Sequence, residues 1–251
     1  MIPRELLPYV LDRSFPLVAG PDDLDRVVPL LEERGGEFCA SLRTDPEMVA
    51  ACCHAGFLPM SEDQTGHEVL LVKSHRRRCV LAPGELHRSK STRRRARGLT
   101  VRVDHDFARC LDEVVRWHPD RWLTDPLCAS LAILHREPRY GVRARSVEVY
   151  DDDALVAGEV GYSCGLVYTS MAAFHGRSGS GSVQLAALGV LLRDAGFALW
   201  DLGMEMEYKR ALGARVTARR PFLELFRSYR DRPTPALARE ADCASLLRRP
   251  A

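Results

Sequence analysis

The sequence predicts an α+β protein whose larger part is built on a curved, mostly antiparallel sheet. Two apolar, alternating runs at 145–150 and 155–162 flank the three aspartates 151–153, a pattern typical of a β-hairpin. A third run at 165–170 continues the alternation, and a helical run and a further apolar run follow it. Successive short strands that precede a helix–strand pair favour an antiparallel sheet with helices packed on it.

The first 60 residues are expected to form a small unit rich in helices and loops. One helix is predicted to begin at Pro21 and to stop at the glycine pair 35–36, with Pro29 bending or ending it on the way. A second helix is predicted over 45–53 and is closed by Gly56.

Basic residues cluster in the chain, although its net charge is only +2. The extended run 69–80 is broken by the cluster 73–78, and 87–97 has the pattern of a short basic helix stopped by Gly98. Such a charge run is often just the solvated face of a surface helix. Two clusters together favour a surface for a nucleic-acid backbone, because several cations must act together to hold phosphates. No aromatic residues are interleaved, so base stacking on these clusters is not expected.

The cysteine pattern and the N-terminus predict a cytoplasmic protein. The eight cysteines show no C-x-x-C spacing, which fits neither a disulfide framework nor a zinc site and suits reduced thiols. The first residues carry proline and charges where a signal peptide needs an apolar core. No apolar run approaches the length of a membrane span.

The middle of the chain supplies further elements of the predicted core. A strand is expected over 99–103, and amphipathic helices over 107–115 and 126–135. Trp117 and Trp122 flank the turn between these helices, and a Trp is more often a packing residue than a ligand contact.

A small-residue loop at 175–182 precedes the predicted helix 183–195, which closes at Gly196. Backbone amides at such a helix start can cradle an anion. The loop has neither the Lys-Ser/Thr ending of a P-loop nor a preceding GxGxxG fingerprint, so a simple flexible turn is an equally good interpretation.

The apolar run 197–205 is predicted to be a strand with Asp201, Gly203 and Glu205 on one face. Burying an unpaired carboxylate costs several kcal/mol, so Asp201 needs partners or water. It either ties down a neighbouring loop or lies in a cleft with a pKa tuned for proton transfer or for holding a cation.

From about Met48 to Phe226 the chain resembles the leucyl/phenylalanyl-tRNA–protein transferases. No single motif decides this, but their order and spacing together are specific. The motifs lie at 48–59, 78–81, 87–95, 122–124, 134–135, 146–150, 165–174 and 201–214. The resemblance implies a catalytic domain similar in fold to the GNAT-type N-acetyltransferases, together with a small N-terminal α/β domain. The expected division is a small domain at 1–86, a basic connecting helix at 87–98 and the GNAT-like domain at 99–251.

The resemblance also implies an aminoacyltransferase. Such an enzyme moves an apolar amino acid, such as Leu or Phe, from aminoacyl-tRNA to an amine acceptor such as a protein N-terminus. It needs no cofactor beyond the tRNA co-substrate and no membrane. The expected catalytic residues are Asp201 and Glu205; the expected substrate-binding residues are Trp122, Glu148, Ser170, Met171, Phe174, Gly203 and Tyr208; the expected tRNA-binding residues are Arg88, Lys90, Arg93, Arg94, Arg95 and Arg97.

Two departures from the family pattern affect the expected site. The family's Gly-Glu-Ser-Met-Phe motif is Ser-Met-Ala-Ala-Phe at 170–174, so Met171 replaces a Glu that would recognise a cationic N-terminal residue. The family's Asp-Cys-Gln becomes Asp-Leu-Gly, so Gly203 replaces a polar group beside the amine. We hypothesise that Glu205 replaces the lost polar function and that acceptor specificity is altered. The alternatives are a catalytically idle relative that binds tRNA or N-degrons, and an acetyl-CoA-dependent N-acetyltransferase.

Overall fold

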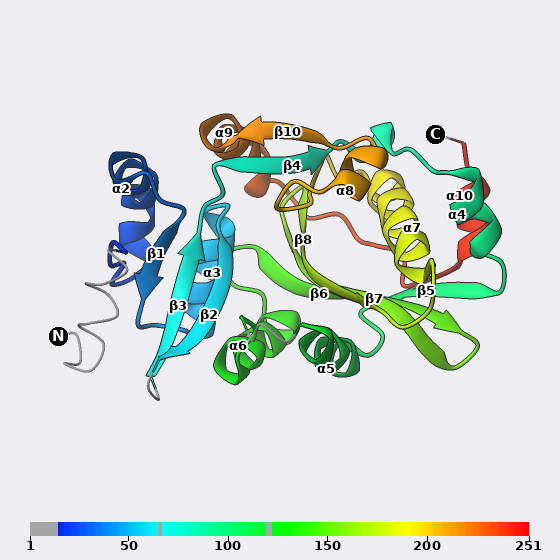
Figure 1. Cartoon of the computed structure of the whole chain (residues 1–251), viewed down its shortest axis with the longest axis horizontal. Helices are drawn as coiled ribbons and strands as arrows, with labels where there is room; N and C mark the ends of the chain where they lie inside the picture. Colours follow the sequence, from blue (N-terminus) through cyan, green and yellow to red (C-terminus); the bar gives the residue numbers. More distant parts are fainter. Residues whose placement is uncertain (1–14, 65–66, 119–121, 251) are drawn as a thin grey trace.

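Two sheets organise the computed structural model, which describes residues 15–64, 67–118 and 122–250 (Figure 1). The three-stranded sheet has the order β1-β3-β2, with β1 at Phe38–Ser41, β2 at Leu58–Gln64 and β3 at His67–Lys73. The eight-stranded sheet has the order β10-β4-β9-β8-β7-β6-β5-β11. Its strands are β4 (Arg77–Leu81), β5 (Leu99–Val103), β6 (Val142–Asp151), β7 (Ala154–Cys164), β8 (Val167–His175), β9 (Leu199–Asp201), β10 (Arg215–Ala218) and β11 (Glu240–Asp242).

Within these two sheets, neighbouring strands are antiparallel except for the parallel pair β8–β9. The prediction of an α+β protein with a mostly antiparallel sheet is confirmed. The helices of the described residues are η2 (Pro21–Arg26), α2 (Val27–Arg34), α3 (Pro46–His54), η3 (Pro83–Glu85), α4 (Lys90–Arg95), α5 (Phe107–Trp117), α6 (Asp125–Arg136), α7 (Ser180–Ala195), α8 (Glu207–Ala211), α9 (Arg219–Arg230) and α10 (Cys243–Arg248).

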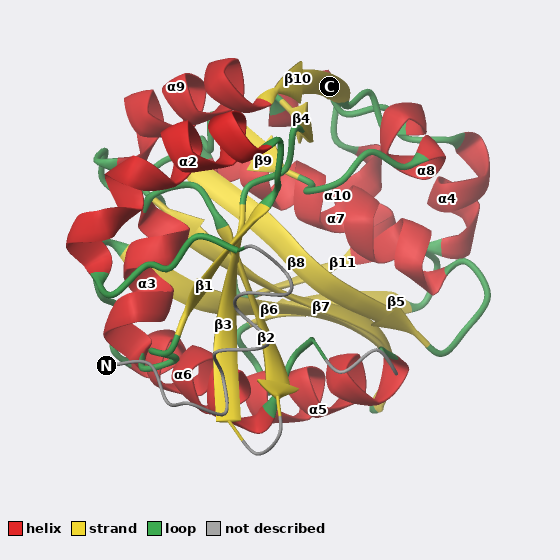
Figure 2. Cartoon of the chain, turned by 60° about the vertical axis from the view of Figure 1, so that its left-hand side comes forward, coloured by secondary structure: helices red, strands yellow, loops and turns green. Residues whose placement is uncertain are grey.

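Helices cover both faces of the large sheet (Figures 1 and 2). One core lies under α5 and α6 and extends to α3 beside the small sheet. The other core lies under α7 and includes residues of α10. No helix in the described part of the chain has the length and apolar character that crossing a membrane requires.

The N-terminal helical region corrects one expectation. The helix predicted from Pro21 forms as η2 followed directly by α2, which ends at Gly35. Pro29 does not end the helix, because α2 continues through it to Arg34. Pro29 is the third residue of α2, and a proline in the first turn removes no intrahelical hydrogen bond.

The strand β4 lies within the range 1–86 but belongs to the large sheet. It pairs with β10 on one side and β9 on the other, with Val80 opposite Asp201. The change of sheet therefore falls between β3 and β4, at 74–76. This arrangement brings the end of β9 against a strand that precedes it by more than a hundred residues.

An irregularity in β7 and β8 shapes the region next to α7. The register shifts between Val160 and Gly161, so Met171 is an extra residue on β8 between Ser170 and Ala172. Such a bulge bends the strand and increases its twist. A side chain at Gly161 would place its Cβ 2.4 Å from the Thr169 carbonyl oxygen, so only glycine fits this crossing.

The predicted strand 197–205 is much shorter than expected. β9 ends at Asp201, and Gly203 has a φ of +74°, which turns the chain away from the sheet. The expectation that Asp201, Gly203 and Glu205 share one strand face is therefore wrong, because the alternation of side chains stops where the strand stops.

Candidate active site

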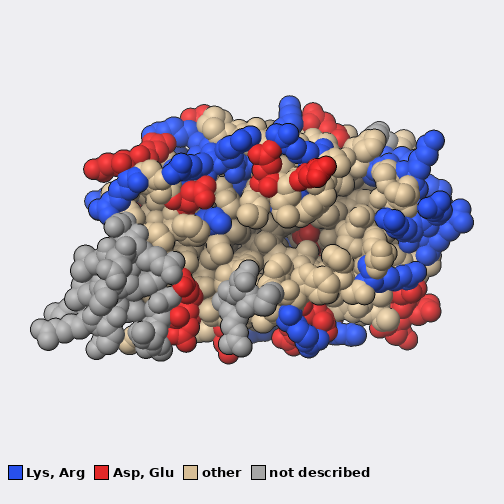
Figure 3. Space-filling model, viewed as in Figure 1, with Lys and Arg blue, Asp and Glu red and all other residues tan. Residues whose placement is uncertain are grey.

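A cavity of about 580 Å³ opens between β8, the start of α7 and the segment after β9. Figure 3 shows this hollow near the centre of the face, with a small acidic surface inside it. Apolar side chains form much of the wall, among them Met171, Phe174, Leu185, Leu202 and Met206. A largely apolar hollow with a few polar groups is the usual form of a small-molecule site.

Glu159 on β7 is the one carboxylate among the described residues that line this cavity, and it is only 1% exposed. Its Oε1 accepts hydrogen bonds from Tyr168 Oη at 3.0 Å and from Ser170 Oγ at 2.9 Å. Its Oε2 is buried and makes no hydrogen bond of good geometry with the described residues, although the Gln184 amide lies against the carboxyl. Burial raises the pKa of this carboxyl, although the nearby Gln184 amide and the two hydroxyls act in the opposite direction.

Ser170 connects Glu159 to the core. While its hydroxyl donates to Glu159, its Oγ accepts a hydrogen bond from Trp200 Nε1 at 2.9 Å. Trp200 is completely buried. The predicted residue Ser170 therefore lies in the cavity wall and fixes the orientation of a carboxylate that the sequence analysis did not single out.

Asp201, predicted to be catalytic, is completely buried and does not line the cavity. Its carboxylate forms a two-pronged ion pair with Arg78 of β4, with Nε to Oδ1 at 2.8 Å and Nη2 to Oδ2 at 2.7 Å. Thr169 Oγ1 donates to Oδ2 and the Gly203 amide donates to Oδ1. Burial alone would lower the pKa of Arg78, but the Asp201 charge and the hydrogen bonds from Arg78 to Asp201 raise it. Asp201 thus ties β9 to β4 and fixes the turn that follows.

Glu205 and Gly203 also lie outside the cavity lining. The Glu205 carboxylate is bound by two arginines, with Arg77 Nη2 at 3.1 Å and Arg210 Nη2 at 2.7 Å. The structure therefore separates Glu205 from the cavity, where it was expected to replace the missing polar group.

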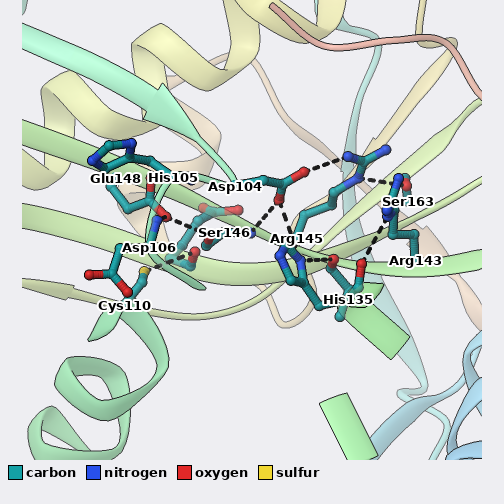
Figure 4. Close-up of polar contacts among 12 residues, drawn as sticks. Asp104, His105, Asp106, Cys110, His135, Arg143, Arg145, Ser146, Glu148 and Ser163 are labelled. Atoms are coloured by element: carbon teal, nitrogen blue, oxygen red, sulfur yellow. Dashed lines mark hydrogen bonds and ion pairs between the residues drawn. The ribbon is translucent and has the colours of Figure 1, made fainter. Parts of the chain in front are cut away.

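Glu148 on β6 holds a turn rather than lining the cavity (Figure 4). It is completely buried, and it accepts a hydrogen bond from Ser146 Oγ at 2.5 Å. It also accepts the backbone amides of His105 and Asp106, each at 3.3 Å, at the start of α5. Burial raises the pKa of Glu148, and these donors oppose that effect. Its surroundings are those of a structural carboxylate.

Among the other predicted substrate-binding residues, Met171, Phe174 and Tyr208 line the cavity together with Ser170. Trp122 does not line it, and its carbonyl accepts a hydrogen bond from the Ser61 amide at 2.9 Å.

Trp117, interpreted from the sequence as a packing residue, instead lines the cavity and is 47% exposed. Its ring centroid lies 4.9 Å from that of His175, another lining residue. No local pattern marks Trp117, because the exposure of an aromatic ring at a helix end depends on the neighbouring elements.

Lys209 of α8 also lines the cavity without having been predicted. Its Nζ donates to the carbonyl oxygens of Leu202 at 2.6 Å and Met204 at 3.0 Å. Burial lowers the pKa of this ammonium group. Lys209 holds the turn after β9 against the cavity.

The predicted basic helix forms α4, capped by Ser89, whose Oγ accepts the Thr92 amide at 3.0 Å. Lys and Arg side chains gather at the end of the molecule where α4 and α10 lie (Figures 1 and 3). The predicted tRNA-binding residues that are exposed there are Lys90, Arg93, Arg94, Arg95 and Arg97. Arg88 is instead buried and donates to the carbonyl of Arg249 at 2.8 Å, which fastens the C-terminal segment.

Arg95 links α4 to the cavity. It lines the cavity and also an adjoining hollow of about 200 Å³ between α4, α7 and α8. Ser182, Leu185 and Tyr208 are shared by the two hollows in the same way. The two hollows therefore share part of their walls, and the basic helix α4 lies next to the cavity whose floor contains Glu159.

The chain is similar to proteins of known family. The model of the family described as leucyl/phenylalanyl-tRNA protein transferase matches residues 80–227. The chain belongs to this family. Relatives with the same description come from Roseobacter denitrificans (30% identical; 78% of this chain and 91% of that protein), Pseudomonas aeruginosa (31%; 81% and 89%) and Jannaschia sp. (33%; 80% and 90%). Among solved structures, a C-terminal DUF2156 domain from Agrobacterium fabrum is similar with a TM-score of 0.39 and 13% identity, over 87% of this chain and 80% of that one.

The family match contains the whole candidate site. Every described residue that lines the cavity, from Arg95 to Lys209, falls within 80–227, and so does α4. Within this family, the chain carries Met171 in the cavity wall and Gly203 in the turn after β9.

Proposed function

We propose that this chain is an aminoacyl-tRNA-dependent transferase. It moves an apolar amino acid such as Leu or Phe from tRNA to an amine acceptor such as a protein N-terminus. The observation that carries the proposal is that the family match spans the cavity and the basic helix together. The apolar wall supports it further, because a Leu or Phe side chain gains about 1.5–3 kcal/mol when it is fully buried.

The exposed cations of α4 would hold tRNA phosphates, since phosphate neutralisation by several Lys and Arg side chains dominates nucleic-acid affinity. The 3′ end of the tRNA would pass Arg95 to reach the cavity. Trp117 offers a half-exposed ring at the rim, and stacking of a base on an aromatic ring contributes about 1–3 kcal/mol. Trp122, which the resemblance placed among the substrate-binding residues, lies outside the cavity lining.

The reaction is the aminolysis of an ester. The acceptor nitrogen attacks the carbonyl carbon of the aminoacyl ester, a C–N bond forms, and the C–O bond to the ribose breaks. The nitrogen loses a proton and the ribose oxygen gains one, so the balance requires no cofactor. The protein contributes by orienting the two substrates and by assisting the proton transfer.

Asp201 enters this proposal as a positioning residue. Through Arg78, Thr169 and the Gly203 amide it fixes the turn from which Leu202, Met206 and Lys209 reach the cavity wall. The parallel β8–α7–β9 unit within an otherwise antiparallel sheet supports the GNAT-like description of the larger domain.

The test is a transfer assay with the purified chain, tRNA charged with labelled Leu or Phe, and peptides that differ in their first residue. We expect label to enter peptides with a free N-terminus and not their N-acetylated forms. Binding of charged tRNA without transfer to any peptide or free amine would overturn the proposal in favour of an idle relative. Acetylation of the same peptides with acetyl-CoA would favour the acetyltransferase alternative.

The tRNA surface has its own test in a variant with Arg93, Arg94 and Arg97 changed to Ala. We expect weaker tRNA binding. The slope of the logarithm of the binding constant against the logarithm of the salt concentration should become shallower by about two to three, since each phosphate contact contributes about 0.9. Arg227→Ala is the control, because this exposed arginine lies on α9, away from α4 (Figure 1). An unchanged slope would remove α4 from the proposed interface.

A further inference from the structure

A second hollow, of about 490 Å³, opens where α2 ends and α9 begins. These two helices lie side by side, away from α4 (Figures 1 and 2). The charged residues among the described lining are three arginines, Arg76, Arg219 and Arg220, and one carboxylate, Glu32. Lys and Arg side chains, interspersed with acids, gather over this end of the molecule (Figure 3). The proposed transfer reaction uses none of these residues.

Arg219 is the first residue of α9, and its guanidinium is only partly satisfied by the protein. The residue is 7% exposed, and its Nη2 donates to the carbonyl oxygens of Gly36 at 2.8 Å and Ser74 at 2.7 Å. Its Nε is buried and has no hydrogen-bond partner among the described residues. Burial lowers the pKa of this guanidinium. A buried donor of a charged group that lacks a partner is costly and rare in native proteins, so an acceptor from outside the chain is expected to complete it.

The start of α9 offers further donors to the same hollow. The helix spans Arg219–Arg230, and Ala218 at its N-cap position has no side-chain oxygen with which to cap it. The first backbone amides of a helix lack intrahelical acceptors, and the helix dipole makes this end positive. Backbone donors and the Arg219 side chain therefore point to the same kind of ligand, an anion.

The neighbouring charges also favour an anion with several oxygens. Arg220 is paired with Glu32, with Nε to Oε1 at 2.8 Å and a second bond from Nη2 to Oε2. Arg76 and Arg219 instead direct their side-chain hydrogen bonds to backbone carbonyls, and neither forms an ion pair in the described part of the chain. Glu37, outside the lining, accepts the Arg76 backbone amide at 2.6 Å. Two guanidinium groups without counter-ions match a phosphate, whose oxygens fit the arginine fork.

We infer that the hollow at the start of α9 binds a phosphate group. Arg219 Nε and the first amides of α9 donate to its oxygens, and Arg76 supplies a second positive charge. The basic cluster 73–78 takes part through Arg76, whereas Arg77 and Arg78 form ion pairs with carboxylates elsewhere. The inference goes beyond the proposed function and does not depend on it, because free phosphate and a phosphate of the tRNA backbone present the same oxygens.

The experiment is calorimetric titration of the full chain with inorganic phosphate at pH 7 and constant ionic strength. We expect one saturable site in the wild type. Arg76→Ala should weaken binding about fivefold, and Arg219→Lys, which keeps the charge but removes the Nε donor, about tenfold or more. Arg227→Ala is the matched control, because this exposed arginine of α9 lies outside the lining, and it should change binding less than twofold.

Ala218→Asp tests the site without altering an arginine. A carboxylate at the N-cap position caps α9 from within the chain, so it should weaken phosphate binding about tenfold and raise the urea midpoint in the absence of phosphate. Phosphate should raise the urea midpoint of the wild type but not that of this variant. Ala218→Ser, which caps the helix without the charge, should weaken binding less. A wild type without saturable phosphate binding, or an Ala218→Asp variant that binds phosphate as the wild type does, overturns the inference.

The same titration in the presence of uncharged tRNA identifies the source of the phosphate. Displacement of phosphate by tRNA, together with weaker tRNA binding by Arg76→Ala, assigns the site to the tRNA backbone. An unchanged phosphate affinity at saturating tRNA assigns it to free phosphate. The transfer assay is read separately: phosphate binding that depends on Arg76, without any transfer, retains the inference and rejects the proposed function, whereas transfer without phosphate binding does the reverse.

Discussion

Two buried carboxylates of the large sheet, Asp201 and Glu159, have opposite surroundings. Asp201 accepts hydrogen bonds on both oxygens, from Arg78, Thr169 and the Gly203 amide, and lies outside the cavity lining. Glu159 lies at the cavity floor, where two hydroxyls donate to Oε1 and the Gln184 amide lies against the carboxyl. Burial alone therefore does not mark a functional acid. What distinguishes the two is whether the protein itself satisfies the charge.

The largest expected effect on stability comes from disrupting the buried ion pair between Asp201 and Arg78. Asp201→Asn leaves the Arg78 guanidinium buried without a counter-charge. Removal of one partner from a buried ion pair costs about 3–5 kcal/mol. We expect a decrease of this size in the free energy of unfolding, measured by urea denaturation at pH 7.

A double-mutant cycle separates the pair from its members. Arg78→Met combined with Asp201→Leu removes both charges and should destabilise the fold by less than the sum of the single changes, because no unpaired charge remains. If the free energy of unfolding of Asp201→Asn instead lay within about 1 kcal/mol of the wild-type value while transfer activity was lost, Asp201 would act in the chemistry rather than in the structure.

The difference between these acids also shows what the sequence could and could not predict. Strands β5 to β8 and helices α5 to α7 follow from local periodicity, which is visible along a single stretch of chain. Asp201 and Glu159 give the same local signal, an acid within an apolar alternating run. The partner of Asp201 is 123 residues away, on a strand whose pairing no local pattern specifies. Local patterns therefore cannot tell Asp201, which is paired within the sheet, from Glu159, which lies in the cavity.

The basic helix α4 also shows that local sequence patterns predict an element but not how its side chains are packed. The charges, the cap and the end of α4 are local features, and the helix forms at Lys90–Arg95, within the predicted range 87–97. Arg88 carries the same charge as its neighbours but is buried against the C-terminal segment, whose approach depends on residues far along the chain. Composition can identify a basic surface, but packing determines which of its arginines are exposed.

A second buried titratable group, His75, makes the stability of the fold depend on pH. His75 is 8% exposed, and burial together with the charges of Arg78, Lys73, Lys209 and Arg219 lowers its pKa to about 3. Between pH 6.5 and 3 the unfolded chain binds a proton at this site that the folded chain does not, so stability falls as pH falls. At pH 4.5 the loss is about 2–3 kcal/mol relative to pH 7, at about 1.4 kcal/mol per pH unit.

His75→Gln should remove this part of the acid sensitivity. Urea denaturation at pH 7 and pH 4.5 gives the difference for each protein, and the variant should lose about 2–3 kcal/mol less than the wild type on acidification. Equal losses in the two proteins would mean that His75 becomes protonated in the folded state, and hence that the surrounding cations do not hold it neutral.

The smallest expected effect on stability belongs to Glu159→Gln. Burial raises the pKa of this carboxyl, so the folded chain binds its proton at higher pH than the unfolded chain does, and the site destabilises the fold as pH rises above the ordinary carboxyl range. Replacing this carboxyl, whose charged form is disfavoured by burial, should therefore change the free energy of unfolding at pH 7 by about 1 kcal/mol or less, or increase stability, with the benefit absent near pH 4. Denaturation of both proteins at the two pH values measures this. A loss of about 3 kcal/mol at pH 7, comparable to that expected for Asp201→Asn, would show that Glu159 is a structural acid of the same kind.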